Sequence, residues 1–126
     1  MNNKLKAALA AVLLVFSSAV MAESYVQVLT CKLNDGMTKE DAHELNAKWL
    51  TWARGIAGTD DIQSSFASTV VGDLGGFSWV DSYPSLTAWA AVAEADEDEE
   101  LVEAFGELAK CTKSSLINLD PTKAGK

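Results

Sequence analysis

The distribution of apolar and polar residues predicts four strands after the first 22 residues of the chain. The strand-like runs are rich in β-branched and aromatic residues and cover 24–33, 62–71, 77–83 and 114–119. Gly-rich residues 72–76 are typical of a hairpin connection between the second and third runs. Alternate side chains of a strand share one face, which places Phe77, Trp79 and Asp81 together.

A long helix is predicted between the first two strands. Thr38 has the character of an N-cap, and Glu40 and Asp41 follow in the first turn, where negative charge is favourable. Gly55 and Gly58 are expected to end the helix. Its apolar residues recur at spacings of three and four and form a stripe that we expect in the core: Ala42, Leu45, Trp49, Trp52, Ala53 and Ile56.

Helical segments also follow the third strand. Pro84 ends the strand, and Ser85 caps a short helix that reaches Ala93. A further segment begins near Asp96, with apolar residues at helical spacing: Leu101, Phe105 and Leu108. The resulting order, β-α-β-β-α-β, is the split βαβ arrangement of an α+β fold. It predicts a four-stranded antiparallel sheet with the helices on one face and the first and last strands side by side.

The first 22 residues have the three parts of a secretory signal peptide. Lys4 and Lys6 give a positive start, residues 7–16 are apolar, and the stretch ends at Ala22 after small or β-branched residues. The apolar run is short for a membrane span, so a cleaved signal is expected rather than a retained anchor. Cleavage after Ala22 predicts an exported chain, periplasmic or secreted, with a single domain over 23–126.

Two cysteines, Cys31 and Cys111, lie in the predicted exported part. In an oxidising compartment an even pair favours a disulfide over free thiols, and two isolated cysteines lack the spacing of a zinc site. Cys31 falls near the end of the first strand and Cys111 just before the last. These two ends meet in the predicted topology, so the cysteine positions and the fold support each other.

The charge excludes some partners. The full sequence has a net charge of −8, and removal of the leader leaves eight basic against 18 acidic residues, a net charge of −10. Binding to nucleic acid or anionic lipid requires basic side chains that neutralise phosphates. We therefore expect no nucleic-acid partner, and no membrane association after signal cleavage.

Two candidate reactive features have simple structural explanations. His43 is the only histidine, and the helical period turns it away from the apolar stripe toward solvent, beside Glu40 and Glu44. The acidic run that begins at Glu94 and continues through residues 96–100 lacks the alternating spacing of a calcium loop. It is better explained as the solvated start of a helix. We expect neither a metal nor a cofactor.

The face of the third strand that carries Phe77, Trp79 and Asp81 is the strongest candidate site. Two aromatic side chains and a carboxylate on one face could line a cavity or an interface between subunits. Ordinary core packing, with Asp81 bonded to backbone or solvent, is the competing interpretation.

Residues Phe77-Ser78-Trp79-Val80-Asp81-Ser82-Tyr83-Pro84-Ser85, followed by Ala88 and Trp89, resemble the dimeric α+β barrel superfamily, which has a ferredoxin-like fold. The resemblance implies a homodimer whose two sheets form a barrel, with a pocket between each sheet and its helices or loops. That superfamily includes quinol and polyketide monooxygenases, haem-degrading enzymes, isomerases and proteins without known activity.

Haem degradation does not fit the sequence. That branch has an Asn on the first strand, a Trp at the end of the third strand and a His on the next helix. Here the first strand has no Asn, Tyr83 takes the aromatic position, and no His follows His43.

Two functional hypotheses follow. The first is an exported homodimer that binds or transforms a small apolar or amphipathic molecule. Asp81 would then be the candidate acid or base, and Phe77, Trp79 and Tyr83 the pocket walls. Cofactor-free oxygenation is the activity that the resemblance alone suggests. The second is a non-enzymatic interaction or stress-associated protein.

Overall fold

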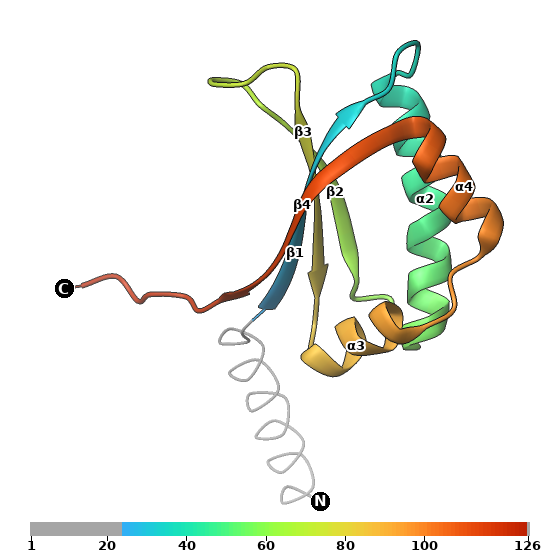
Figure 1. Ribbon diagram of the computed structural model, residues 1–126. Coiled ribbons are helices and arrows are strands. Elements are labelled where there is room, and N and C mark those ends of the chain that lie inside the picture. Colours follow the sequence, from blue (N-terminus) through green and yellow to red (C-terminus); the bar gives the residue numbers. More distant parts are fainter. Residues whose placement is uncertain (1–23, 126) are drawn as a thin grey trace, which may run out of the picture. The chain divides into compact units, whose positions relative to one another are not determined.

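A four-stranded antiparallel sheet with helices on one face forms the protein (Figure 1). The computed structural model describes residues 24–125, of which Ser24–Leu119 form one compact unit. The predicted signal peptide lies outside the described residues. The elements in chain order are β1 (Ser24–Leu33), α2 (Lys39–Ala57), β2 (Gln63–Ser68), β3 (Phe77–Tyr83), α3 (Leu86–Glu94), α4 (Glu99–Leu108) and β4 (Ala109–Leu119).

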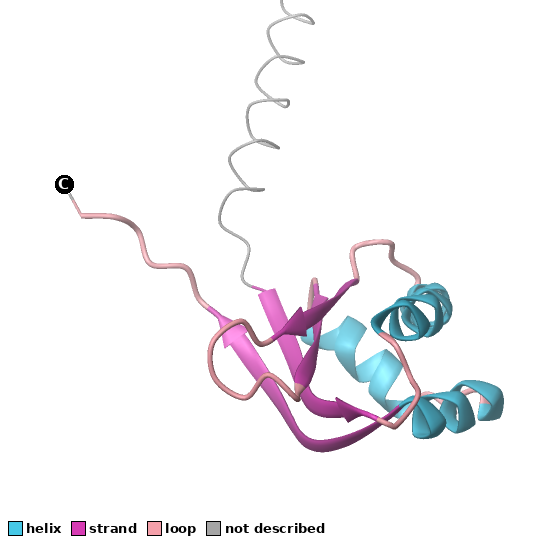
Figure 2. Cartoon of the chain, turned by 90° about the horizontal axis from the view of Figure 1, so that it is seen from above, coloured by secondary structure: helices cyan, strands magenta, loops and turns pink. Residues whose placement is uncertain are grey.

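The order of strands in the sheet is β2-β3-β1-β4, and every neighbouring pair is antiparallel. The first and last strands are therefore adjacent, as the predicted split βαβ topology requires. Seen from above, α2, α3 and α4 all lie on the same side of the sheet (Figure 2). The predicted α+β fold is confirmed. Within residues 24–125, no helical segment has the length and hydropathy that a membrane crossing requires.

The long helix α2 begins as the sequence predicts. The hydroxyl of Thr38 accepts a hydrogen bond from the backbone N–H of Asp41, and the Asp41 carboxylate accepts one from the backbone N–H of Thr38. The helix ends at Ala57, and Gly58 forms its C-cap with a φ of 67°, in the left-handed region. Gly55 lies inside the helix, so its predicted role as a terminator is wrong. The prediction that Ile56 lies in the core is also wrong, because its side chain is 43% exposed.

Two strands differ in length from the prediction. β2 ends at Ser68, and Val70 and Val71 beyond it are exposed in the hairpin loop, because neither residue pairs with β3. β4 begins at Ala109, directly after α4 and five residues earlier than predicted. Backbone pairing with β1 holds this early part of β4, so its strand structure does not depend on apolar side chains.

The pairing of β1 with β4 places the two cysteines opposite each other. Cys31 and Cys111 are partners in the register and form a disulfide. The register shifts between Thr30, which pairs with Lys113, and Cys31, so Thr112 is an extra residue in β4. If the register of Thr30 and Lys113 continued without a shift, Thr112 would pair with Cys31, and Cys111 would lie opposite Lys32 on the other face of the sheet. The predicted disulfide is confirmed, although Cys111 lies within the last strand and not before it.

The core has two parts, both between the sheet and the helices. One gathers buried residues around the disulfide and the start of β3: Cys31, Ala42, Phe77, Trp79 and Leu108. The other gathers buried residues around the end of β3: Ala53, Ile62, Tyr83, Ala88 and Val92. β3 runs through both parts of the core, so its helix-facing residues also line the space between them.

Candidate functional site

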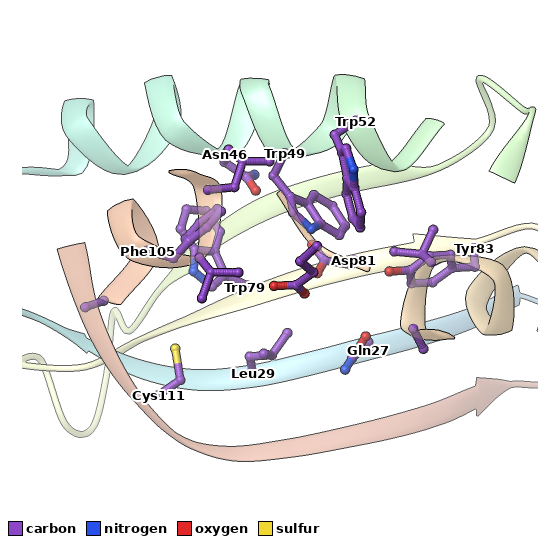
Figure 3. A pocket seen from close by; sticks show the side chains of 16 residues that line it. Gln27, Leu29, Asn46, Trp49, Trp52, Trp79, Asp81, Tyr83, Phe105 and Cys111 are labelled. Atoms are coloured by element: carbon purple, nitrogen blue, oxygen red, sulfur yellow. The ribbon is translucent and has the colours of Figure 1, made fainter. Parts of the chain in front are cut away.

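A pocket of about 440 Å³ opens between the helix-covered face of the sheet and the helices (Figure 3). It draws side chains from β1, α2, β3, α3, α4 and β4. Its lining residues are Gln27, Leu29, Asn46, Trp49, Trp52, Trp79, Asp81, Tyr83, Val92, Ala93, Glu97, Leu101, Val102, Phe105, Ala109 and Cys111. The volume lies within the range of sites that hold small molecules, roughly 300–1,000 Å³.

Aromatic side chains form most of the wall. Trp49 and Trp52 project from α2 toward the sheet, and Trp79 lies on β3 near Phe105 of α4 (Figure 3). The rings of Trp79 and Phe105 meet edge to face, with centroids 6.3 Å apart and an interplanar angle of 88°. Trp49 and Trp52 also pack against the second part of the core. They therefore serve both as core residues, as predicted, and as pocket wall, which was not predicted.

Asp81 lies beneath the two α2 tryptophans and is only 5% exposed (Figure 3). The register of the sheet places it between Ser64 on β2 and Gln27 on β1. The Ser64 hydroxyl donates a hydrogen bond of 2.5 Å to Oδ1 of Asp81. In turn, Nδ2 of Asn46 on α2 donates a hydrogen bond of 2.8 Å to the Ser64 oxygen. This chain of donors fixes one oxygen of the carboxylate from the side of β2.

The environment makes the Asp81 carboxyl weakly acidic. Removal from water disfavours the charged form and raises its pKa from 3.8 to about 6, against the opposing effect of the Ser64 hydrogen bond. A carboxyl group with such a pKa changes its protonation state close to neutral pH. It has the property required of a general acid or base.

Tyr83 lies two residues further along the same face of β3. Its hydroxyl points toward Asp81 (Figure 3). Burial raises the pKa of this phenol, and the negative charge of Asp81 raises it further. Tyr83 therefore stays protonated at physiological pH and can donate a hydrogen bond to a molecule in the pocket.

A second chain of hydrogen bonds positions Gln27 on the other side of Asp81. The indole N–H of Trp89 on α3 donates to Oε1 of Gln27 over 3.3 Å. Nε2 of Gln27 donates to the Ser114 hydroxyl on β4 over 3.1 Å. Both ends of the amide are thus engaged, so Gln27 presents a fixed side chain beside the carboxylate.

The structure brings together three of the four residues predicted at the site. Trp79, Asp81 and Tyr83 line the pocket, whereas Phe77 does not. Phe77 is buried in the core and stacks on Phe66, with ring centroids 4.2 Å apart. Phe77 continues the alternation of helix-facing residues along β3. However, packed side chains cover the start of this strand, and the cavity lies further along it.

Sequence reasoning missed Asn46, Ser64 and Gln27. Ser64 and Gln27 carry no signal of their own, and only the strand register shows that they flank Asp81. Asn46 carries a weak signal, because it is a polar residue within the apolar stripe of α2. A buried amide at such a position requires a hydrogen-bond partner, which is here Ser64.

Of the two features expected to be structural, His43 lies outside the pocket lining, whereas Glu97 of the acidic run lines the pocket. His43 is exposed and contacts Phe66, with ring centroids 5.8 Å apart. Asp98 caps α4, and Glu99 and Glu100 occupy its first turn, as predicted for the acidic run. In the part of the chain that the structure describes, no cluster of three His, Cys, Asp or Glu side chains is arranged to hold a metal ion.

Comparison with known proteins yields only structural matches, since no family model and no curated protein matches the sequence. The protein At3g17210 from Arabidopsis thaliana has a TM-score of 0.54 and 18% identity, over 81% of this chain and 99% of that chain. A NIPSNAP-like domain protein from Burkholderia xenovorans has a TM-score of 0.51 and 16% identity, over 82% and 89%. Hydroxynitrile lyase from Passiflora edulis has a TM-score of 0.52 and 10% identity, over 83% and 99%.

These similarities establish the fold. The arrangement of strands and helices is shared over about four fifths of the chain, in agreement with the predicted ferredoxin-like fold. Identities of 18% or less carry no activity across to this chain.

Proposed function

We propose that the protein is an exported homodimer that binds a small apolar or amphipathic molecule in the pocket over Asp81. The observation that supports this most strongly is Asp81, an acidic residue that is only 5% exposed at the base of an aromatic-lined pocket. A filled core offers no reason to retain a buried acid without a basic partner. Within this proposal, Asp81 is the group that could exchange a proton with the ligand, and Tyr83 is a hydrogen-bond donor.

The test uses a neutral amphipathic fluorophore, N-phenyl-1-naphthylamine, titrated into the purified protein. We expect saturable enhancement of its fluorescence and quenching of tryptophan emission, because three tryptophans line the pocket. L101W fills the pocket and should weaken binding about tenfold or more. L86W is the control, because Leu86 is 48% exposed and lies outside the pocket.

Two results would contradict the binding proposal. One is the absence of saturable binding, and the other is equal binding by L101W and the wild-type protein. Either would favour the alternative function, a non-enzymatic interaction or stress-associated protein that requires only a filled interior.

The face of the sheet opposite the helices supports the homodimer. The register places on it only uncharged residues and three lysines: Ser24, Val26, Val28, Thr30, Lys32, Gln63, Ser65, Ala67, Ser78, Val80, Ser82, Lys110, Lys113, Ser115, Ile117 and Leu119. In a chain with 18 acidic residues, the absence of any acid from this described face is distinctive. Ile117 and Leu119 are 43% and 49% exposed, and a second copy would cover such apolar side chains.

Analytical ultracentrifugation tests the homodimer. We expect the wild-type protein to sediment as a dimer and V80K to sediment as a monomer, because the added charge would be buried between two sheets. V71K is the matched control, since Val71 is 92% exposed in the β2–β3 loop. A monomeric wild-type protein, or a V80K variant that remains dimeric, would contradict the proposal.

The Cys31–Cys111 disulfide supports the export part of the proposal. Structural disulfides form and persist in oxidising compartments, and both cysteines of the chain are engaged in this one. Cleavage of the leader predicts an intact mass that corresponds to residues 23–126. Recovery of the uncleaved chain from a secreting host would contradict it.

A further inference from the structure

We propose that the ligand of the pocket is an organic ammonium ion, a positively charged nitrogen on an apolar body, and that Asp81 is its counter-ion. The inference rests on the proposed function, because it specifies the chemistry of a molecule in the same pocket. Three observations support it: the sign of the charges that line the pocket, its aromatic wall, and the arrangement of hydrogen bonds around Asp81.

All of the charged side chains that line the pocket are acidic. Asp81 lies at its base and Glu97, in the connection between α3 and α4, lies at its edge. None of the sixteen lining residues is Lys, Arg or His, and the remaining titratable group is the phenol of Tyr83. A cation that enters the pocket therefore meets attraction only, whereas an anion meets a buried negative charge.

The wall is suited to a cation that has lost its water. Trp49, Trp52, Trp79, Tyr83 and Phe105 surround the space above the carboxylate. The faces of aromatic rings carry negative potential and attract alkylammonium groups, with tryptophan the strongest. The same rings provide apolar surface for the rest of the molecule, so one wall serves both parts of an amphipathic amine.

The hydrogen bonds around Asp81 leave one oxygen of the carboxylate available to a ligand. Oδ1 accepts from Ser64, which is itself held by Asn46. Within residues 24–125, the hydrogen bond from Ser64 to Oδ1 is the only one that the carboxylate accepts, and no basic side chain lines the pocket beside Oδ2. An ammonium N–H would provide both the missing donor and the missing positive charge.

The competing interpretation is a protonated Asp81 that donates a hydrogen bond to a neutral or anionic ligand. A proton on Oδ2 would leave the Ser64 bond to Oδ1 intact, so the two interpretations differ in the charge of the carboxyl group and in the sign of charge that the acidic pocket lining favours. The pKa of about 6 leaves the carboxylate mostly ionised at pH 7 even without a ligand.

The experiment compares three probes of the same length, octylammonium, 1-octanol and octanoate, as competitors of the bound fluorophore N-phenyl-1-naphthylamine. In the wild-type protein we expect octylammonium to displace it at about a tenth of the concentration of 1-octanol, and octanoate to be the weakest. D81N should bring octylammonium and 1-octanol within about twofold of each other. E103Q is the charge-matched control, because Glu103 is exposed on α4 outside the pocket, and it should keep the preference.

If D81N fails to fold, the pH dependence of the octylammonium preference in the wild-type protein tests the same proposal. From about pH 8 to about pH 5, Asp81 gains a proton while octylammonium stays charged, so the preference should fall toward unity. The titratable lining groups that accompany this change are Glu97 and Tyr83, and Tyr83 stays protonated throughout. E97Q should retain the pH-dependent fall if Asp81 is its source.

The outcomes separate this inference from the proposed function. Binding of the fluorophore and 1-octanol without a preference for octylammonium would overturn the ammonium ligand and leave the pocket as a binding site. A preference for octanoate, or an ammonium preference that survives in D81N and at low pH, would also overturn it. If no probe displaces the fluorophore because the fluorophore itself does not bind, the proposed function fails as well.

Discussion

Ser64 and Asp81 are direct partners across β2 and β3, and their side chains are joined by a hydrogen bond of 2.5 Å on the helix-covered face. The bond links a residue of the edge strand to the base of the pocket. It also opposes the effect of burial, because a donor to the carboxylate stabilises its charged form. The protonation state of Asp81 therefore depends partly on Ser64 of β2, a strand that contributes no residue to the pocket wall.

Removal of the Ser64 hydroxyl should raise the pKa of Asp81. S64A deletes the donor and leaves desolvation unopposed, so we expect the pKa to rise above 6 by about one unit. Carbon-13 NMR of the aspartate carboxyl carbons would measure it. S65A is the matched control on the same strand, since Ser65 is exposed and faces away from the helices. An unchanged pKa in S64A would show that the bond does not act on Asp81.

Neutralising Asp81 should stabilise the protein above its pKa. The folded-state pKa of about 6 exceeds the ordinary 3.8, so the folded state binds the proton more tightly than the unfolded state does. This contribution favours folding below about pH 4 and is lost as the pH rises to about 6. At pH 8 we expect D81N to exceed the wild-type free energy of unfolding by about 2 to 3 kcal/mol, and to approach it near pH 4.

Urea denaturation at a series of pH values would measure this difference. The variant E103Q corrects for the loss of one negative charge from an exposed position. A D81N variant that is less stable than the wild type at pH 8 would mean that the charged carboxylate contributes favourably to folding.

Loss of the disulfide should cost about 2 to 4 kcal/mol of stability, because the bond closes a loop with a sequence separation of 80. C31A/C111A should unfold at lower urea concentration than the oxidised wild type. Dithiothreitol should lower the midpoint of the wild type and leave that of the double variant unchanged. Equal midpoints for the oxidised protein and the variant would be inconsistent with a stabilising bond.

Phe77 and Phe105 should differ in what their substitution changes. Phe77 is 4% exposed and stacks on Phe66, so F77L should lower stability by about 1 kcal/mol and leave fluorophore affinity within about twofold. Phe105 lines the pocket, so F105L should weaken the fluorophore several-fold. Urea denaturation and fluorophore titration of both variants together distinguish a core residue from a residue of the pocket wall. A larger loss of fluorophore affinity in F77L than in F105L would contradict these assignments.

Deletion of Thr112 should leave the disulfide intact. Thr112 is the extra residue of the bulge, so without it Lys113 stays opposite Thr30 and Cys111 follows opposite Cys31 in a regular ladder. We expect no alkylatable thiols by mass spectrometry after the deletion. Deletion of Val71, in the exposed hairpin loop, should also leave none. Two alkylatable thiols in the Thr112 deletion would show that the bulge itself is required to join the cysteines.

The sequence predicted the elements whose signals are local. The strand 77–83 and the Thr38 cap follow from alternation and from the chemistry of a helix start, and both are confirmed. The early start of β4 was missed because its residues 109–113 are held by backbone pairing with β1, which has no side-chain pattern. The bulge at Thr112 was missed for the same reason.

The site was predictable only along one strand. Alternation grouped Trp79 and Asp81 because both lie on β3, and the aromatic at Tyr83 followed from the resemblance. Ser64 and Gln27 reach Asp81 across strand pairs, and their positions depend on a register that turns and bulges determine. Side chains from three helices complete the pocket, and helix packing lies beyond what a one-dimensional pattern specifies.

The covalent bond between Cys31 and Cys111 also turns most of the folded chain into a ring. Every loop from the first turn to the end of α4 lies within that ring, including the exposed hairpin that carries Val70 and Val71. A single cut by a protease in such a loop would open the ring without releasing a fragment. A nicked molecule would therefore keep all four strands on one covalent framework.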